Sequence, residues 1–290
     1  MSEDERLAEL LADAASGGLP PAVIAMRLLM EASGPGQARR ALDEALRNAP
    51  SEPLAAVSNL MDREPGAWHV VRTVIDAVAH EAPHDDPVAH WARLFDNAVQ
   101  ASPEGSVALY SLGNPSLLAT ATDEIVGRMR DWELIGPNRA VLDVGCGIGR
   151  LGARLAPHVG EIIGLDISPG MIAEAERRCA AVPNLRFAVS GGRDLAGIGT
   201  RTMDLVVFVD SFPYLQLSGE DLAGGHVAEA ARVLRPAGAV LILNASYGRS
   251  IPEDRADLAR FAQAAGLVLK RVEKRPFQTW DAPAFVLAEP

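Results

Sequence analysis

The sequence predicts an α/β protein in which a mostly parallel sheet follows an all-helical region. From residue 139 onward, short runs rich in Val, Ile and Leu alternate with amphipathic helical patterns, the order that builds a parallel sheet covered by helices. Over 1–104, by contrast, apolar residues recur only at helical spacing, and Gly and Pro separate the segments. We therefore divide the chain into a helical region, 1–104, and an α/β domain, 105–290.

The helical region is predicted to consist of short helices. Leu7 and Leu11 share one helical face, and Gly17-Gly18 ends that helix. Asp86 as N-cap and Pro87 as the first helical residue begin the last long helix. No fixed repeat period links the segments, so we do not expect a solenoid. The apolar pattern of that last helix covers residues 88–99, and the other helical patterns cover residues 23–30, 38–45, 54–61 and 68–78.

The α/β domain is predicted to alternate strands and helices and to end in two strands. Buried parallel strands are short apolar runs, whereas helices show a 3.6-residue spacing. A short connection between the last two strands favours an antiparallel hairpin. The predicted strands are 140–144, 161–166, 185–190, 204–209, 238–244, 267–275 and 279–287, and the predicted helices are 116–133, 149–157, 169–181, 219–234 and 253–265.

Residues 141–150 carry the most informative motif, a strand that runs into Gly-x-Gly-x-Gly and then a helix. Gly145, Gly147 and Gly149 place no Cβ between the backbone and a ligand, while N–H groups at the start of the helix point toward it. This arrangement predicts a nucleotide-type cofactor site.

Two carboxylates flank this loop. Asp143 stands two residues before the first glycine, and Asp166 ends the next predicted strand. Together with the glycine spacing and the terminal hairpin, they resemble the class I S-adenosylmethionine-dependent methyltransferases, and the resemblance covers about 105–290. It implies a Rossmann-like seven-stranded sheet with the last strand antiparallel, S-adenosyl-L-methionine as cofactor, and methyl transfer as the reaction.

The alternative is an NAD(P)-dependent oxidoreductase with a Rossmann-type fold. Its fingerprint, Gly-x-Gly-x-x-Gly, needs a third glycine where this chain has Arg150. A guanidinium side chain there would crowd the contact between helix and strand. Asp166 does not separate the two interpretations, because both folds use an acid at this strand end to hold ribose hydroxyls.

The resemblance assigns the ribose hydroxyls to Asp166, whose charge-assisted hydrogen bonds would contribute about 1.5–3 kcal/mol each. Asp166 could instead cap the following helix, but Ser168 and Pro169 already supply that cap. Asp143 is implied to orient the methionine part of the cofactor, or it satisfies N–H groups of the turn. The other implied cofactor contacts are Gly145, Cys146, Gly147 and Gly149 through the backbone, Ile167 and Met171 against the adenine, and Asp210.

The third family motif departs from the pattern. Many members place Gly-Asp after the third strand, and the acid accepts from the adenine amino group. This chain has Ser190-Gly191 there. Asp194 could take the role after a shift of the loop, or backbone groups and a water could do so. The adenine contact is therefore open, while cofactor binding as a whole does not depend on it.

The segment after the predicted strand 204–209 is expected to face the transferred methyl group, because ligands of open α/β sheets sit at the carboxyl ends of strands. Asp210, Tyr214 and His226 are candidate catalytic residues that position the acceptor or take its proton. The structural alternative packs Tyr214 and leaves His226 on a solvated helix. A sulfonium methyl is already electrophilic, so a base is needed only if the acceptor must lose a proton. Candidate acceptor-binding residues are Tyr110, Arg150, Phe212, Tyr214, Tyr247 and Trp280.

Charge and composition limit the partners. The net charge of −11 argues against nucleic acid, whose binding needs clustered Lys and Arg. No apolar run approaches the roughly 20 residues that span a bilayer, and the N-terminus is acidic, so we expect a cytoplasmic protein without membrane contact. Cys146 and Cys179 are expected as free thiols. His84 and His90, six residues apart, do not share a helical face, so no metal site is predicted.

These limits favour a small-molecule methyl acceptor. We expect the helical region to cap the substrate pocket, to mediate a homodimer contact, or to do both. A methyltransferase-like subunit that binds cofactor without catalysis is the alternative from another class; the altered third motif favours it, and Asp143 and Asp166 oppose it.

Overall fold

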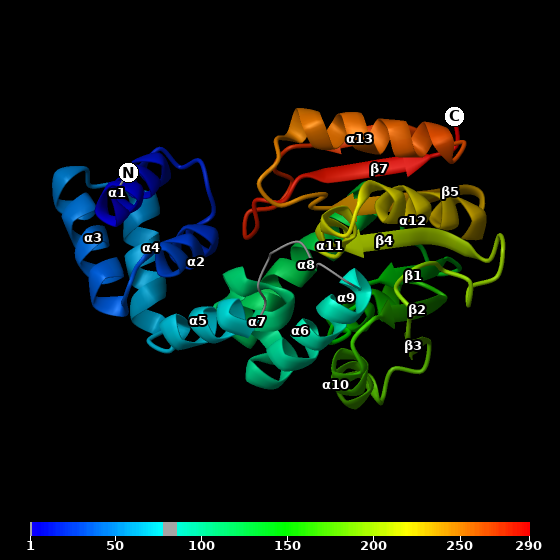
Figure 1. The fold of residues 1–290 in the computed structure, drawn as a ribbon, viewed down its shortest axis with the longest axis horizontal. Helices are drawn as coiled ribbons and strands as arrows, with labels where there is room; N and C mark the ends of the chain where they lie inside the picture. The colour runs from blue at the N-terminus through cyan, green and yellow to red at the C-terminus, as the bar shows by residue number, and fades with distance from the viewer. Residues whose placement is uncertain (1, 78–85) are drawn as a thin grey trace. The chain divides into compact units, whose positions relative to one another are not determined.

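A computed structural model describes residues 2–77 and 86–290 (Figure 1). Contacts between residues group the chain into two compact units, and each is described by itself. As far as its residues are described, the first unit comprises 1–79, 97–121 and 277–281, and the second comprises 80–96, 122–276 and 282–290.

The first unit is all-helical, as the sequence predicts. Its first helix begins with a capping box, in which Ser2 Oγ accepts from Glu5 N and Glu5 Oε2 accepts from Ser2 N. The apolar faces of the helices form one core around Leu7, Leu28 and Leu42, all fully buried. The elements are α1 (Glu3–Ala15), α2 (Pro21–Glu31), α3 (Pro35–Asn48), α4 (Glu52–Arg63), α5 (Ala67–Ala77), α7 (Pro103–Val107) and the short helix η1 (Leu109–Ser111).

The second unit is built on a seven-stranded sheet of β1 (Ala140–Val144), β2 (Glu161–Asp166), β3 (Leu185–Val189), β4 (Met203–Val209), β5 (Leu234–Leu243), β6 (Val268–Glu273) and β7 (Ala284–Ala288). The strands stand in the order β3-β2-β1-β4-β5-β7-β6. The first five pair in parallel, and β7 lies antiparallel between β5 and β6. The predicted Rossmann-like sheet with an antiparallel last strand is confirmed.

Two helices have residues in both units, α6 (Pro87–Ala101) and α8 (Pro115–Asp131). The single boundary between residues 104 and 105 therefore stays a prediction. The predicted start of α6 is confirmed, because Asp86 Oδ1 accepts from the backbone N–H groups of Val88 and Ala89. The other helices of the second unit are α9 (Arg150–Leu155), η2 (Ala156–His158), α10 (Pro169–Cys179), α11 (Phe212–Leu217), α12 (Glu220–Val233) and α13 (Ile251–Ala264).

Helices α12 and α13 cover one face of the sheet (Figure 1). Ala223 and Val227 of α12 and Leu258 of α13 pack with Leu142 and Phe208, which point to the same face of their strands. This core holds the strands in register, so that their carboxyl ends form one edge. Within the described ranges, we find no helix with the length and apolar character needed to cross a bilayer.

The structure differs from the prediction in the last connection. The strand predicted over 279–287 begins only at Ala284, so the hairpin is joined by a long loop. Phe277 and Trp280 of that loop are buried within the first unit, with rings stacked 5.9 Å apart. Pro276 and Pro283 flank them and have no N–H for a sheet ladder. Burial of these two aromatic side chains is a tertiary effect that strand spacing does not reveal.

Candidate active site

Four loops meet at the carboxyl edge of the sheet in the second unit. They follow β1, β2, β4 and β5, which are parallel neighbours. The strand order reverses between β1 and β4, the place where open α/β sheets bind ligands. We call residues 143–150 and 166–171 the glycine half of the site, and residues 210–218 and 244–247 the tyrosine half.

The glycine loop requires glycine both for conformation and for space. Gly145, Gly147 and Gly149 have φ values of 78°, 52° and 75°, where an L side chain is strained. A Cβ on Gly145 would lie 2.3 Å from Ser211 Cβ, and one on Gly149 would lie 2.7 Å from Phe187 Cζ. Both the positive φ and the close packing against Ser211 and Phe187 therefore require glycine in this loop.

Asp166 connects the glycine loop to the turn after β2. Its Oδ2 accepts from Gly147 N at 2.9 Å, and its Oδ1 accepts from Ser168 N at 3.0 Å. Burial raises the pKa of this carboxyl to about 6. Ser168 Oγ, and not Asp166, accepts from Met171 N at the start of α10. The alternative role of Asp166 as the cap of this helix is therefore wrong.

Asp143 is a buried carboxyl that lacks a hydrogen-bond partner among the described residues. Its side chain is 1% exposed, and neither oxygen has a hydrogen-bond partner within the described ranges. Burial raises its pKa to about 7, while the charge of Arg150 acts to lower it and that of Asp166 to raise it. Because an unsatisfied buried polar group costs about 1–3 kcal/mol, this carboxyl fits a ligand that brings a cationic donor. Contrary to the structural alternative, neither oxygen accepts from an N–H group of the turn in the part of the chain that the structure describes.

The two cysteines lie against the glycine loop as free, buried thiols, as predicted. Cys146 Sγ donates to Gly147 O and Cys179 Sγ donates to Gly149 O, at 3.8 and 3.7 Å. Burial raises the pKa of both thiols. Neutral thiols are poor nucleophiles, so Cys146 would meet a ligand through its backbone.

The predicted adenine side is closely packed. Met171 is 2% exposed, and Ile167 is half-buried beside Gly192, which has φ of 67°. A Cβ on Gly192 would lie 2.5 Å from Ile167 Cγ2 and 2.7 Å from Val88 Cγ1. The turn after β2, the loop after β3 and the start of α6 therefore converge at this point.

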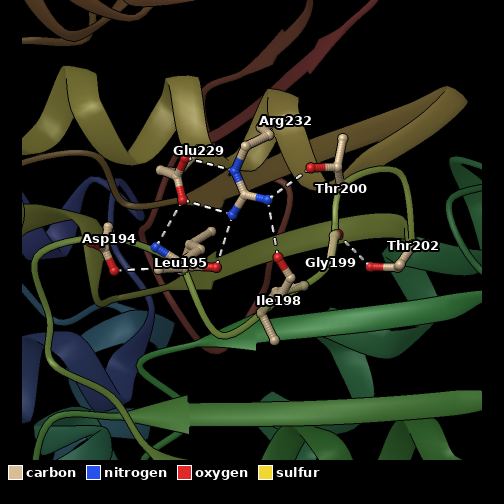
Figure 2. A network of polar contacts seen from close by, with 9 residues as sticks. Asp194, Leu195, Ile198, Gly199, Thr200, Thr202, Glu229 and Arg232 are labelled. Carbon is tan, nitrogen blue, oxygen red and sulfur yellow. Dashed lines mark hydrogen bonds and ion pairs between the residues drawn. The ribbon is translucent and has the colours of Figure 1, made fainter.

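Asp194 is exposed and accepts from Ala196 N at 3.1 Å, a local turn bond. Figure 2 shows how the loop that follows is held: Glu229 Oε2 accepts from Leu195 N, and Arg232 donates to Leu195 O at 2.9 Å. This network fixes the loop but does not direct Asp194 to a ligand. The adenine contact of Asp194 stays a prediction.

The tyrosine half is organised around Asp210. Asn244 Nδ2 and Tyr247 OH donate to Asp210 Oδ1 at 2.7 and 3.1 Å, and Tyr247 OH lies 3.3 Å from Tyr214 OH. Asp210 and Asn244 both have left-handed backbone, with φ of 60° and 62°, a conformation that Asp and Asn tolerate best after Gly. Burial raises the pKa of both tyrosines, and the Asp210 charge adds to this. The tyrosine hydroxyls therefore keep their protons, and Asp210 is the acceptor of the cluster.

Sequence reasoning identified Asp210, Tyr214 and Tyr247 but missed Asn244. The available signal was its position, since Asn244 directly follows β5 as Asp210 directly follows β4. Two residues that tolerate left-handed backbone at neighbouring parallel strand ends are placed side by side by the sheet.

The ring of Tyr214 packs edge-to-face against Trp91 and Phe95, with centroids 4.9 Å apart in both pairs. Tyr247 adds a third edge-to-face contact at 5.6 Å. Trp91 is 1% exposed, and its Nε1 donates to Ser218 Oγ at 3.1 Å. The ring of Tyr214 is thus packed, as the structural alternative predicted. Its hydroxyl nevertheless lies in the Asp210 cluster.

The structure separates two other candidates from this cluster. Phe212 is fully buried in the core, with its ring 5.5 Å from Phe208, so its placement gives no support to a substrate contact. His226 is 2% exposed, which makes the alternative of a solvated position wrong. Its Nδ1 lies 2.9 Å from Leu222 O, and burial lowers the pKa of the imidazole. Both residues are explained by the packing of α11 and α12.

Three more predicted acceptor contacts, Arg150, Tyr110 and Trp280, lie outside the Asp210 cluster. Arg150 begins α9, and its Nη1 donates to Thr122 Oγ1 at 3.0 Å. Tyr110 and Trp280 lie in the first unit, both buried and stacked with centroids 5.5 Å apart. Their contacts with an acceptor stay predictions.

The histidine and aspartate cluster near residue 84 is covered in part. His84 and Asp85 lie outside the described residues. Within the described ranges, no group of three or more His, Cys, Asp or Glu is placed to hold a metal ion.

An open cavity of about 470 Å³ lies beside the site, lined by Pro87, Val88, Arg193 and residues 218–222, and not by the glycine loop.

Comparison with known proteins agrees with this geometry. Residues 141–238 match a family model described as a methyltransferase domain. A demethylmenaquinone methyltransferase of Tropheryma whipplei is 31% identical over 109 residues, which are 38% of this chain and 43% of that protein. The chain spans less than half the length of the curated relatives it matches.

Two solved structures share the fold. Magnesium protoporphyrin IX methyltransferase from Synechocystis, with bound S-adenosylmethionine, has a TM-score of 0.54 at 18% identity and covers 71% of this chain and 99% of that chain. The second is Haemonchus contortus phosphoethanolamine N-methyltransferase 1 in complex with phosphoethanolamine and S-adenosylhomocysteine. It has a TM-score of 0.56 at 15% identity, and the match covers 69% of this chain and 48% of that chain. Residues 141–238 are thus similar to a methyltransferase domain, and the sheet has the fold of class I S-adenosylmethionine-dependent methyltransferases.

Proposed function

We propose that the protein binds S-adenosyl-L-methionine and transfers its methyl group to a small-molecule acceptor. The observation that carries the proposal is the buried carboxyl of Asp143, which has no hydrogen-bond partner among the described residues and lies beside a loop that requires glycine. The methionine part of the cofactor carries an ammonium group, which would give Asp143 a charge-assisted partner. Because the carboxyl fits this group, the cofactor explains a feature that packing leaves unsatisfied.

The glycine half would hold the cofactor at both ends. Asp166 would accept from the ribose hydroxyls, and the glycine backbone would lie against the methionine part. Ile167 and Met171 would contact the adenine through apolar atoms. When bound, the cofactor supplies an electrophilic methyl on a sulfonium.

The tyrosine half would hold the acceptor. Asp210 would accept a hydrogen bond or a proton from it, because the hydroxyls of Tyr214 and Tyr247 remain protonated. Asn244 and Tyr247 fix the Asp210 carboxylate, so the acceptor would be oriented by a group that does not have to reorganise. Arg150, Tyr110 and Trp280 are further proposed acceptor contacts.

Two features support a small acceptor. The net charge of −11 disfavours a polyanion such as nucleic acid. One structural neighbour is a phosphoethanolamine N-methyltransferase, which acts on a small molecule. We also propose that residues 1–104 cap the acceptor site or form a homodimer contact; the support is that they lead directly into the helix before the glycine loop.

Calorimetry tests the proposal. We expect S-adenosylmethionine and S-adenosylhomocysteine to bind and NAD not to bind. Binding of NAD alone would select the oxidoreductase, and no binding of either sulfur compound would refute cofactor use. A metabolite screen that detects release of S-adenosylhomocysteine then tests transfer: cofactor binding with no turnover on any acceptor would favour the non-catalytic subunit.

A further inference from the structure

The first part of α6 contacts the cofactor side of the site through Asp96. Asp96 Oδ1 accepts from Ser168 Oγ and from Gly170 N, the latter at 2.8 Å. Ser168 Oγ in turn accepts from Met171 N at 3.0 Å. Asp96, which stands 72 residues before Ser168 in the chain, therefore accepts hydrogen bonds from residues at the N-terminus of α10.

This contact continues to the ribose-binding carboxylate. Ser168 is fully buried, and its backbone N–H is the donor to Asp166 Oδ1 at 3.0 Å. Asp96 thus holds the side chain of the same residue whose main chain holds Asp166. If Ser168 rotated or shifted, Asp166 would lose one of the backbone donors that fix its carboxylate.

The position of α6 is itself fixed on its other side. Trp91 and Phe95 pack on Tyr214, and Trp91 Nε1 donates to Ser218 Oγ. Val88 lies against the loop after β3, where a Cβ on Gly192 would meet it at 2.7 Å. Asp96 is therefore presented by a helix segment that contacts Tyr214, Ser218 and the loop after β3 within the second unit.

We infer that Asp96 is a positioning residue of the cofactor site, which holds the turn from Asp166 to Ser168 so that the Asp166 carboxylate meets the ribose hydroxyls. The inference rests on the proposed function. A cap for α10 does not by itself require Asp96, because Ser168 Oγ already accepts from Met171 N. The Asp96 carboxylate instead links the turn between Asp166 and Ser168 to helix α6.

Titration of the full chain with S-adenosylhomocysteine tests this role. Asp96→Ala is expected to raise the Kd about tenfold, the size of one lost hydrogen bond to a charged group. Asp96→Asn keeps an oxygen that accepts from Ser168 and Gly170, so it should restore most of the affinity and leave a loss of about threefold. Ser168→Ala should raise the Kd about as much as Asp96→Ala does. Because both changes break the same link, the Kd of the double variant should not exceed the higher Kd of the two single variants.

Glu253→Ala is the matched control. Glu253 Oε2 accepts from Ser250 N and Ser250 Oγ, at 2.8 and 2.6 Å, at the start of α13. Its loss should lower the thermal midpoint as Asp96→Ala does but leave the Kd unchanged. An unchanged Kd in folded Asp96→Ala, or effects of Asp96→Ala and Ser168→Ala that multiply, would overturn the inference. If Asp96→Ala does not fold, an unchanged Kd in Asp96→Asn would likewise overturn the inference. Failure of the unaltered protein to bind would instead refute the proposed function.

Discussion

The two halves of the site are held together in different ways. In the glycine half, residues 143–150 and 166–171 are fixed mainly by backbone: positive φ at the glycines and N–H groups that donate to Asp166. In the tyrosine half, residues 210–218 and 244–247 are fixed mainly by side chains, with Asn244 and Tyr247 on Asp210 and two rings of α6 on Tyr214. Backbone recognition suits a ligand that never changes, whereas a side-chain cluster can be altered for a different acceptor without disturbing the fold.

The comparison predicts that cofactor affinity depends on the glycine half and the contacts that hold it, and not on the tyrosine half, and Asp166→Ala should show the largest effect. Removal of two charge-assisted hydrogen bonds to ribose hydroxyls should weaken the binding of S-adenosylhomocysteine about 100-fold or more. Asp123→Ala is the control, because Asp123 forms only an exposed pair with Arg154. Calorimetry on both variants checks this, and equal affinity in the two would break the assignment of the ribose site.

The buried carboxyl of Asp143 makes the glycine half sensitive to pH. Its pKa is raised from 3.8 to about 7, so the folded protein holds a proton there that the unfolded chain has released. The stability that this provides is complete below about pH 3.8 and is lost as the pH rises through about 7. Relative to Asp143→Asn, the free energy of unfolding of the ligand-free protein should fall by roughly 2–3 kcal/mol between pH 5 and 7.

Urea unfolding of both proteins at several pH values measures this difference. Asp166 is present in both, so its own titration largely cancels. Saturating S-adenosylhomocysteine should flatten the difference, because its ammonium group favours the ionised carboxyl. A difference that does not change with pH would mean that Asp143 is ionised, with a partner that the site already supplies.

The same contrast explains what the sequence could predict. Gly145, Gly147 and Asp166 were identifiable because a backbone site leaves local marks: glycine where φ is positive and an acid at a strand end. Asp96 left no such mark, since its function comes from contacts with residues far away in the chain, and the signal for Asn244 was its position directly after β5. The strands were equally readable from apolar runs, whereas the connection that carries Trp280 was not, because its burial depends on a ring stacked from Tyr110.

In the tyrosine half, Asp210→Asn should lower turnover without affecting cofactor binding. The amide keeps the size of the side chain but accepts hydrogen bonds weakly and takes no proton, so kcat should fall about tenfold to thirtyfold if the acceptor must lose a proton. The Kd for S-adenosylhomocysteine should stay within about threefold, because the glycine half is unchanged. Release of S-adenosylhomocysteine with the screened acceptor measures the first quantity and calorimetry the second. Loss of affinity instead would place Asp210 against the cofactor and merge the two halves.

Tyr247→Phe should give the smallest effect, because it removes one donor to Asp210 Oδ1 and leaves Asn244 at 2.7 Å in place. Because Asn244 still holds the carboxylate, kcat should fall only about threefold to fivefold, the size of one neutral hydrogen bond. Asn244→Ala is the informative partner, since it removes the shorter bond from a half-buried position and should cost more. A Tyr247→Phe loss as large as that of Asp210→Asn would show that the hydroxyl itself contacts the acceptor, and the tyrosine half would then be a two-residue binding site and not a carboxylate with supports.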